Sequence, residues 1–425
     1  MNFAKWETKE NMEKNNLLVG IDAKTEIISV GLPIAYDEEK LYLTKRLNHS
    51  LVIGSTGSGK TQSISLPILE LSARTGESVV VHDVKNELYE ATKENFRNRG
   101  YNIIRLNLDD ARDCNYWNPF ELPNKLYKEG NKDKAQDLIE DLGFYLLNDL
   151  KDTSDPFWLN STIDYFTGLT LYAIENNEEV NLDTILDLDS KVRVDAKELI
   201  NNIDKKSNVY INLRGVLEAP PETKGSILSV FSQKIKRYIS KENLKNILSK
   251  TDFDLAKIGQ EKTIIYIVSG NSSNSTRLLP LLISQIYYAK DEYSSNSGKI
   301  NFIIDEFHSL YPIKDFSKML EYSRGLYITF TVLIRGFNDL INIYGKEETE
   351  ILKMCFDNIV YLLSQDINTL EEISHLCGNT CEDGNVRPLI TVEELKHIGY
   401  FEAVILMPRL MPFKTKLLPY YQMKK

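Results

Sequence analysis

Short apolar runs rich in β-branched residues recur along the chain. They are Leu51–Ile53, Val79–His82, Ile103–Leu106, Ile264–Val268, Phe302–Ile304, Ile328–Ile334, Ile359–Leu363 and Ala403–Leu406. Near-continuous apolar runs of this length are typical of the central strands of a parallel sheet, because both faces of such a sheet are covered. Helical patterns separate several of the runs, as at residues 62–74 and 86–99. The alternation of strand and helix predicts a three-layer α/β domain with a mostly parallel central sheet.

Strand patterns fade between Trp117 and Glu218. Amphipathic helical patterns separated by turns rich in Asn, Asp and Lys take their place, at residues 134–148, 160–176 and 194–203. The simplest arrangement is an all-α domain inserted into the α/β domain. We therefore predict three segments: the first part of the α/β domain at 1–117, the all-α insert at 118–218, and the second part of the α/β domain at 219–425.

The composition is that of a protein with a large core, since 42% of the 425 residues are hydrophobic and 26% are charged. No apolar run approaches the roughly 18 to 20 residues that a membrane-spanning helix needs, and the N-terminus lacks the apolar core of a secretory signal. The four cysteines are too few for a disulfide framework, which favours a reducing cytoplasm. Zinc binding by Cys377, Cys381, His375 and His397 is considered, but buried apolar roles are preferred because the spacing is unusual for structural zinc.

The net charge of −10 argues against a protein whose whole surface attracts nucleic acid. One segment nevertheless carries seven basic residues against the single acid Glu242: Lys224, Lys234, Lys236, Arg237, Lys241, Lys245 and Lys250. Two interpretations stay open for this basic segment. It is either a solvated helix face or a local surface that faces DNA.

A complete phosphate-binding loop follows the first apolar run. Its residues are Gly54, Ser55, Thr56, Gly57, Ser58, Gly59, Lys60 and Thr61. The glycines let successive backbone N–H groups point at phosphate oxygens. Lys60 then reaches the β- and γ-phosphates, and the Thr61 hydroxyl becomes a magnesium ligand. The helix that begins at Thr61 turns its positive end toward the anion, so the sequence predicts binding of ATP with Mg²⁺.

A second acidic site is predicted where the run Phe302–Ile304 ends in Asp305 and Glu306. Asp305 can hold the magnesium ion, and Glu306 can polarise the attacking water. This pairing favours ATP hydrolysis over signalling-type GTP binding. The sequence also contains no guanine-reading Asn-Lys-x-Asp run.

Arg324 is a candidate for stabilising charge on the γ-phosphate. Ring ATPases often supply such an arginine from the neighbouring subunit. Arg324 precedes the run Ile328–Ile334. The alternative is an exposed or salt-bridged surface arginine.

Together with the phosphate-binding loop, further segments resemble the type IV secretion coupling proteins, the TraG/TraD-type ATPases of bacterial conjugation. These segments are Val81–Tyr89, Trp117–Phe120, Asp155–Trp158, Glu222–Ile227, Ile304–Phe307, Ser323–Gly325, Tyr344–Gly345, Arg387–Thr391, Pro412–Phe413 and Tyr420. They follow the order of the family and cover nearly everything after about Gly31.

The resemblance implies a RecA-like motor domain with an inserted all-α domain that recognises cargo or DNA. It also implies a hexameric ring that escorts relaxase-bound single-stranded DNA to a secretion channel. A ring accounts for an acidic exterior with one basic segment, because only the central channel meets phosphate.

Three features depart from the family. Its members usually begin with transmembrane helices, whereas the residues before this P-loop contain no apolar run of that length. We therefore expect this chain to be cytoplasmic, either soluble or held at the membrane by a separate partner. The family's Asp-Pro-Lys-Gly-Glu segment is replaced by Asp83-Val84-Lys85-Asn86-Glu87. Finally, Arg335 stands where the family commonly has a glutamine that senses the γ-phosphate. An arginine also binds phosphate, but a fixed cation can bind ATP and ADP alike.

Two alternative functions stay open. One is an FtsK/HerA-like DNA segregation or packaging motor from the same superfamily. The other is a recruitment platform that binds ATP mainly to assemble and hydrolyses it weakly, which the presence of Arg335 would favour.

Overall fold

The computed structural model describes the chain except residues 1–2, 16, 23–28, 38–39, 46–47, 150–154, 177–178, 202, 270–274, 295–296 and 424–425. It divides into two compact units. The first comprises residues 1–104, 257–268 and 290–425, and the second comprises residues 105–256 and 269–289. Among the helices in the described ranges, none is both long and apolar enough to cross a membrane.

A nine-stranded sheet forms the centre of the first unit, and every apolar run predicted as a strand is one of its strands. Their order is β14(Phe413–Lys416), β13(Glu402–Leu406), β10(Asn358–Leu363), β4(Ser50–Gly54), β9(Ile328–Ile334), β8(Ile300–Ile304), β5(Ser78–His82), β7(Thr263–Val268) and β6(Asn102–Asn107). The strands from β10 to β7 pair in parallel, whereas β13 and β14 are antiparallel additions at one edge. The predicted mostly parallel α/β fold is therefore confirmed.

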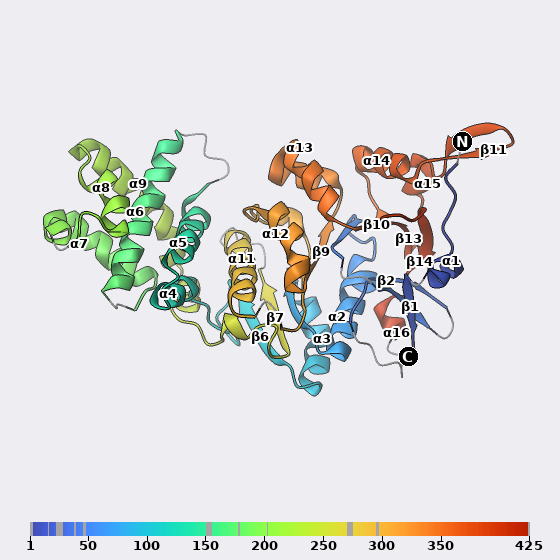
Figure 1. The fold of residues 1–425 in the computed structure, drawn as a ribbon, viewed down its shortest axis with the longest axis horizontal. Coiled ribbons are helices and arrows are strands. Elements are labelled where there is room, and N and C mark those ends of the chain that lie inside the picture. The colour runs from blue at the N-terminus through green and yellow to red at the C-terminus, as the bar shows by residue number, and fades with distance from the viewer. Residues whose placement is uncertain are drawn as a thin grey trace. The chain divides into compact units, whose positions relative to one another are not determined.

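Helices cover both faces of this sheet (Figure 1), which explains why β4, β5, β8 and β9 are buried along their whole length. On one face, Val81 and Leu333 share a hydrophobic core with α2(Leu66–Thr75) and α3(Glu87–Asn98). On the other face, the rings of Phe302 and Phe330 stack with centroids 4.6 Å apart. The ring of Phe316, from α12(Phe316–Ser323), packs edge-on against Phe330. These three layers fix the strand ends that carry the site.

Smaller elements complete the first unit. A second sheet has the order β1(Leu18–Ile21), β3(Leu41–Thr44) and β2(Pro33–Tyr36), and a hairpin is made of β11(Asn379–Glu382) and β12(Asn385–Pro388). The remaining α-helices are α1(Lys9–Lys14), α13(Phe337–Cys355), α14(Ile367–Cys377), α15(Val392–Lys396) and α16(Tyr420–Met423). Helix α11(Ser275–Ser294) begins in the second unit and ends in the first.

The second unit is built almost wholly of helices, drawn mainly in green in Figure 1. They are α4(Glu121–Lys128), α5(Lys132–Leu147), α6(Pro156–Glu175), α7(Leu182–Asn201), α8(Asn208–Leu217), α9(Pro221–Ile239) and α10(Glu242–Ile247). Helix α6 packs against α5, α7, α8 and α9. Its N-terminus is fixed by Pro156 in the first turn and by the Asp155 carboxylate, which accepts the Phe157 N–H at 2.9 Å.

This helical unit is larger than the insert predicted at 118–218. Residues 219–256 cluster with it because α9 packs on α6, where the rings of Phe231 and Tyr165 meet with centroids 5.2 Å apart. A further difference is that α7 begins earlier than the predicted segment at 194–203. Its backbone departs from helical geometry at Asp195.

Candidate functional site

The site lies where the parallel strands of the first unit end. Strands β4 and β8 are not neighbours, because β9 lies between them. Their carboxyl ends still face the same edge of the sheet, so the phosphate-binding loop after β4 and the acids after β8 lie beside one cavity. The P-loop residues from Ser55 to Thr61 line this cavity together with Asp305 and Glu306.

The conformation of the loop depends on its glycines. Gly57 and Gly59 have φ of +80° and +94°, which L side chains rarely adopt. A Cβ on Gly54 would lie 2.4 Å from Ser58 Oγ and 2.8 Å from Lys60 Cγ. The loop therefore leaves no room for side chains at its base. It leads directly into a π-helical turn, Thr61–Ser65, that opens the helix α2.

Lys60 lies under the loop. Its Nζ donates to the Gly54 carbonyl at 2.5 Å. Burial lowers the pKa of Lys60, while the nearby carboxylates of Asp305 and Glu306 act in the opposite direction. The lysine charge is thus electrostatically coupled to the acids that follow β8.

Asp305 and Glu306 have different surroundings. Burial raises the pKa of Asp305 to about 6, although the Lys60 ammonium and the Glu306 N–H favour its ionised form. The Glu306 N–H donates to Asp305 Oδ1 at 2.9 Å, and the His82 ring lies 2.6 Å from the Asp305 carbonyl. Glu306 has φ of +48°, a strained value for a non-glycine residue, and its side chain is 25% exposed. Asp305 is therefore fixed in place, while Glu306 is more open to solvent.

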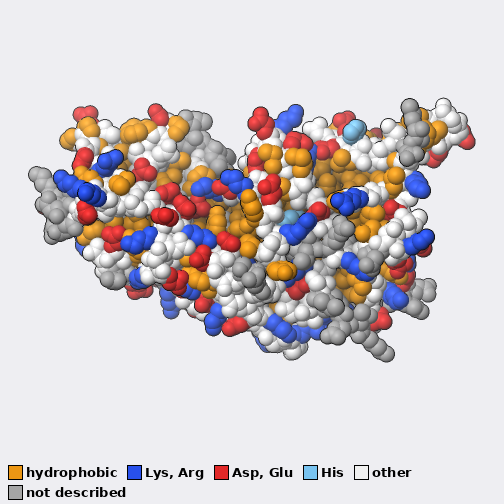
Figure 2. Space-filling model, in the orientation of Figure 1, with side chains coloured by type: hydrophobic (Ala, Val, Ile, Leu, Met, Phe, Trp, Pro, Cys, Tyr) orange, Lys and Arg blue, Asp and Glu red, His pale blue; other side chains and the backbone are white. Residues whose placement is uncertain are grey.

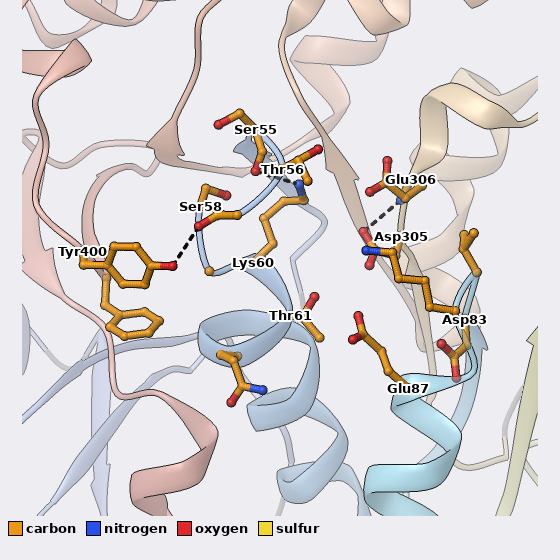
Figure 3. Close-up of a pocket in the computed structure, with 16 residues that line it drawn as sticks. Ser55, Thr56, Ser58, Lys60, Thr61, Asp83, Glu87, Asp305, Glu306 and Tyr400 are labelled. Atoms are coloured by element: carbon orange, nitrogen blue, oxygen red, sulfur yellow. Dashed lines mark hydrogen bonds between the residues drawn. The ribbon is translucent and has the colours of Figure 1, made fainter.

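The cavity, of about 300 Å³, suits a nucleotide phosphate with Mg²⁺. Ser58 Oγ and Gln62 Oε1 are buried and have no hydrogen-bond partner within the described residues, so polar groups are available for an anion and its water. Thr61 and Asp305 offer the hard oxygen ligands that Mg²⁺ prefers, and Mg²⁺ usually takes only one or two of these from a protein besides phosphate oxygens. Figure 3 shows Thr61, Glu87 and Asp305 directed toward this common space.

The described residues give no support to the hypothesis of a zinc site. In the part of the chain that the structure describes, no group of three or more His, Cys, Asp or Glu side chains is arranged to hold a metal ion. Cys377 is buried, which raises the pKa of its thiol to about 12, whereas Cys381 is exposed.

Several cavity residues were not predicted as part of the site. They are Gln62 after the P-loop, Asp83, Val84, Lys85 and Glu87 after β5, and Tyr400 and Phe401 before β13. Asp83 accepts the Tyr89 N–H at 2.8 Å and so caps α3. Asn86 adopts φ of +61°, a left-handed conformation that asparagine tolerates, where the family has glycine. Asn86 thus adopts a conformation that glycine at this position would also allow.

The two candidate arginines lie at opposite ends of β9. Arg335 follows the strand at the edge of the sheet that carries the P-loop, but it does not line the cavity. Its charge acts on Lys60, and its guanidinium is paired with Asp339 at 2.8 Å. Arg324 precedes the strand and therefore lies at the amino edge of the sheet, away from the P-loop of its own chain. Its side chain is 67% exposed and lies 3.4 Å from the Asp357 carboxylate.

The basic segment forms α9 and α10 of the helical unit. Three of its cations are in ion pairs: Lys234 and Arg237 with Asp149, and Lys245 with Asp183. Lys234 is also buried, so the segment is not a uniformly solvated face. On the face of the molecule in Figure 2, acidic and basic side chains are interspersed.

Comparison with protein families gives a match over most of the chain. Residues 1–384 match the family described as type IV secretory system conjugative DNA transfer. A comparison with curated protein sequences gives no match.

Solved structures show where this fold recurs. The plasmid coupling protein TrwB in complex with the non-hydrolysable ATP analogue ADPNP is 14% identical with a TM-score of 0.70, and the match covers 98% of this chain and 94% of that chain. TrwB in complex with ADP and Mg²⁺ has the same identity and coverage and a TM-score of 0.69. VirB4 of Thermoanaerobacter pseudethanolicus is 12% identical with a TM-score of 0.56, covering 95% of this chain and all of that chain. The predicted RecA-like P-loop fold is thereby confirmed.

Proposed function

This chain belongs to the type IV secretory system conjugative DNA transfer family, and we propose that it is an ATPase that couples DNA to a type IV secretion channel. The observation that carries this proposal is the convergence of Lys60, Asp305 and Glu306 on one cavity. Two separate strand ends contribute a phosphate-binding cation, a magnesium ligand and a general base, which together suffice for phosphoryl transfer to water.

Each residue has a distinct task in this proposal. The P-loop N–H groups and Lys60 bind the β- and γ-phosphates. Thr61 and Asp305 hold Mg²⁺, which neutralises phosphate charge when bound. Glu306 accepts the proton of the attacking water. The solvent access of Glu306 suits this task, because a base needs contact with the water that it activates.

Steady-state ATP turnover of the purified chain, with and without single-stranded DNA at low salt, tests the proposal. We expect turnover that DNA stimulates. Lys60→Ala is expected to remove nucleotide binding or turnover without loss of fold, and Glu306→Gln to bind ATP but lower kcat by 100-fold or more, on the order of a lost general base. Wild-type turnover in the Lys60→Ala protein would overturn the site, and indifference to both DNA and Glu306→Gln would overturn the motor.

The partners follow from the family and from the residues at the sheet edges. We propose single-stranded DNA carrying a relaxase as cargo, the secretion channel as destination, and a separate membrane partner that holds the chain at the cytoplasmic face. The first unit would bind nucleotide, and the second, helical unit would recognise cargo. Arg324 would serve the site of the next subunit in a hexameric ring, since it is exposed at the edge opposite its own P-loop.

Arg335 favours a second candidate function, a recruitment platform that binds ATP to assemble and turns it over slowly. ATP-dependent assembly without DNA-stimulated turnover would support it. An FtsK/HerA-like segregation or packaging motor differs in cargo, and it would translocate naked DNA without need of a relaxase.

A further inference from the structure

The nucleotide cavity has two chemically different ends, one on each side of the P-loop strand β4. On one side, the segments after β5 and β8 line it with Lys85 and four acidic residues: Asp83, Glu87, Asp305 and Glu306. On the other side, β10 pairs with β4 in parallel and β13 pairs with β10 antiparallel. The turn before β13 therefore reaches the carboxyl edge of the sheet and brings Tyr400 and Phe401 to the cavity.

This turn holds the two aromatic rings in a fixed arrangement. The Tyr400 hydroxyl donates to the Gly57 carbonyl at 3.1 Å. The rings of Tyr400 and Phe401 meet edge to face, with centroids 4.9 Å apart. The Phe401 carbonyl accepts the Leu417 N–H at 2.8 Å, which ties the turn to the segment after β14. The Tyr400 ring is thus held both at its hydroxyl and by its neighbour.

The backbone at Phe401 is strained. Its φ of +62° lies in the left-handed region, which bulky side chains rarely adopt. Strain of this kind persists only where the surrounding structure imposes it, and it concentrates at sites that bind ligands. At Gly59 a Cβ would lie 2.9 Å from Phe401 Cε1, so the strained turn places its aromatic pair directly against the P-loop.

The Tyr400 ring remains open to a ligand. The residue is 70% exposed although its hydroxyl is bonded, and it lines the cavity. Stacking on an aromatic face favours every nucleic-acid base, because each base has a π-face of its own. The acidic end of the cavity offers a neutral base no comparable surface.

The direction of a bound nucleotide follows from its phosphates. In the proposed function, the β- and γ-phosphates lie at Lys60, whose charge is coupled to Asp305 and Glu306. The ribose and base follow the α-phosphate at the other end of the nucleotide, so they extend away from these acids. Figure 3 shows Tyr400 and Asp305 on opposite sides of the P-loop.

We propose that Tyr400, held in place by Phe401, is the surface on which the base of the bound nucleotide stacks. This inference rests on the proposed ATPase function and identifies what the site recognises besides phosphate. Stacking uses the face of the base and not its hydrogen-bonding edge. The surface therefore distinguishes a nucleotide from bare triphosphate, but not adenine from guanine.

Calorimetric titration with two ligands tests this proposal: a non-hydrolysable ATP analogue and inorganic tripolyphosphate, each with Mg²⁺. The readout is the ratio of the Kd for tripolyphosphate to the Kd for the analogue. Tyr400→Phe and Tyr400→Leu both lack the hydroxyl, but only phenylalanine keeps an aromatic face. We expect Tyr400→Phe to keep the wild-type ratio and Tyr400→Leu to lower it about tenfold, on the order of one lost stacking contact.

Tyr322→Leu is the matched control, because Tyr322 on α12 is also 70% exposed but does not line the cavity. It is expected to leave both Kd values unchanged. Equal weakening or loss of both ligands in Tyr400→Leu would overturn the inference, since Tyr400 would then only support the loop. Wild type that binds tripolyphosphate as tightly as the analogue would overturn it too. If wild type binds neither ligand, the proposed function itself is overturned.

Discussion

The phenolic hydroxyl of Tyr400 donates to the backbone carbonyl of Gly57 at 3.1 Å, so a side chain from just before β13 contacts the tip of the P-loop (Figure 3). The neighbouring Phe401 packs at Gly59, where a Cβ would lie 2.9 Å from Phe401 Cε1. Tyr400 itself remains 70% exposed beside the cavity. The position of the loop that binds phosphate therefore depends on two aromatic residues far along the chain.

Tyr400→Phe is expected to weaken nucleotide binding by up to about fivefold, since it removes one hydrogen bond worth about 1 kcal/mol but keeps the ring. Tyr400→Ala is expected to weaken it further, because the loop then also loses the ring that flanks it. Titration with a fluorescent ATP analogue measures both. Equal affinity in wild type and both variants would show that Tyr400 does not support the loop.

The sheet could be predicted because its central strands are buried on both faces and so leave continuous apolar runs. Other strands lack that signal. The hairpin of β11 and β12 consists of mostly exposed, polar residues, and β14 carries Lys414 and Lys416 in its four residues. The extent of the helical unit was also unpredictable, because the helical pattern of α9 does not show which unit its apolar face packs against.

His49 is expected to make stability depend on pH. Its Nδ1 accepts the Phe330 N–H at 3.0 Å, while Nε2 lies 3.0 Å from the Leu320 carbonyl, an arrangement that suits only the neutral ring. Burial lowers the pKa of His49 to about 4. Because the unfolded chain takes up this proton near pH 6.5 and the folded chain does not, the free energy of unfolding decreases as pH falls from about 6.5 toward 4, by at most about 1.4 kcal/mol per pH unit.

Urea unfolding between pH 5 and 7 measures this slope, with His49→Gln as the comparison, since glutamine offers a donor and an acceptor without titrating. The variant is expected to retain part of the slope, because burial also lowers the pKa of His82 to about 4. The same dependence of the free energy of unfolding on pH in wild type and variant would contradict the prediction.

The site was predictable where a local motif encodes it. Lys60, Thr61, Asp305 and Glu306 each follow an apolar strand in a recognisable pattern. Tyr400 carries no such pattern, because only the order of strands in the sheet brings it to the P-loop. Asp339 lies in the first turn of α13, but Arg335 precedes the helix, so the spacing rule for helical ion pairs does not predict their contact.

Asp149 is expected to stabilise the helical unit. Its carboxylate pairs with Lys234 at 2.5 Å, with Arg237 at 3.0 Å and with Arg277. The Arg237 guanidinium, with the other two cations, holds the pKa of Asp149 well below its usual range. Asp149→Ala leaves three cations close together, and we expect a loss of about 1 to 3 kcal/mol, less than for a fully buried pair because Asp149 is partly exposed.

Thermal unfolding of the Asp149→Ala protein measures this loss of stability, and Asp183→Ala is the control. Asp183 pairs with Lys245, but both side chains are over 40% exposed, so we expect less than about 1 kcal/mol. Similar effects of the two substitutions would show that the three-cation cluster adds no special stability.

Arg324 is expected to act between subunits of an assembly. Within one chain it lies at the end of β9 opposite the P-loop, so the proposal assigns it to the site of another subunit. Arg324→Ala is therefore expected to lose turnover but not nucleotide binding. When it is mixed with Lys60→Ala subunits, each supplies the half that the other lacks, and about a quarter of the interfaces in an equal random mixture become complete.

ATP turnover across mixing ratios measures this rescue, and it should peak near equal amounts. Lys318→Ala is the matched control, because Lys318 is a 71% exposed cation on the nearby helix α12. It is expected to retain full turnover alone. If the Arg324→Ala protein alone keeps wild-type turnover, or if no ratio restores activity, Arg324 does not act across subunits, and its contact with Asp357 is then only a surface interaction of little energetic weight.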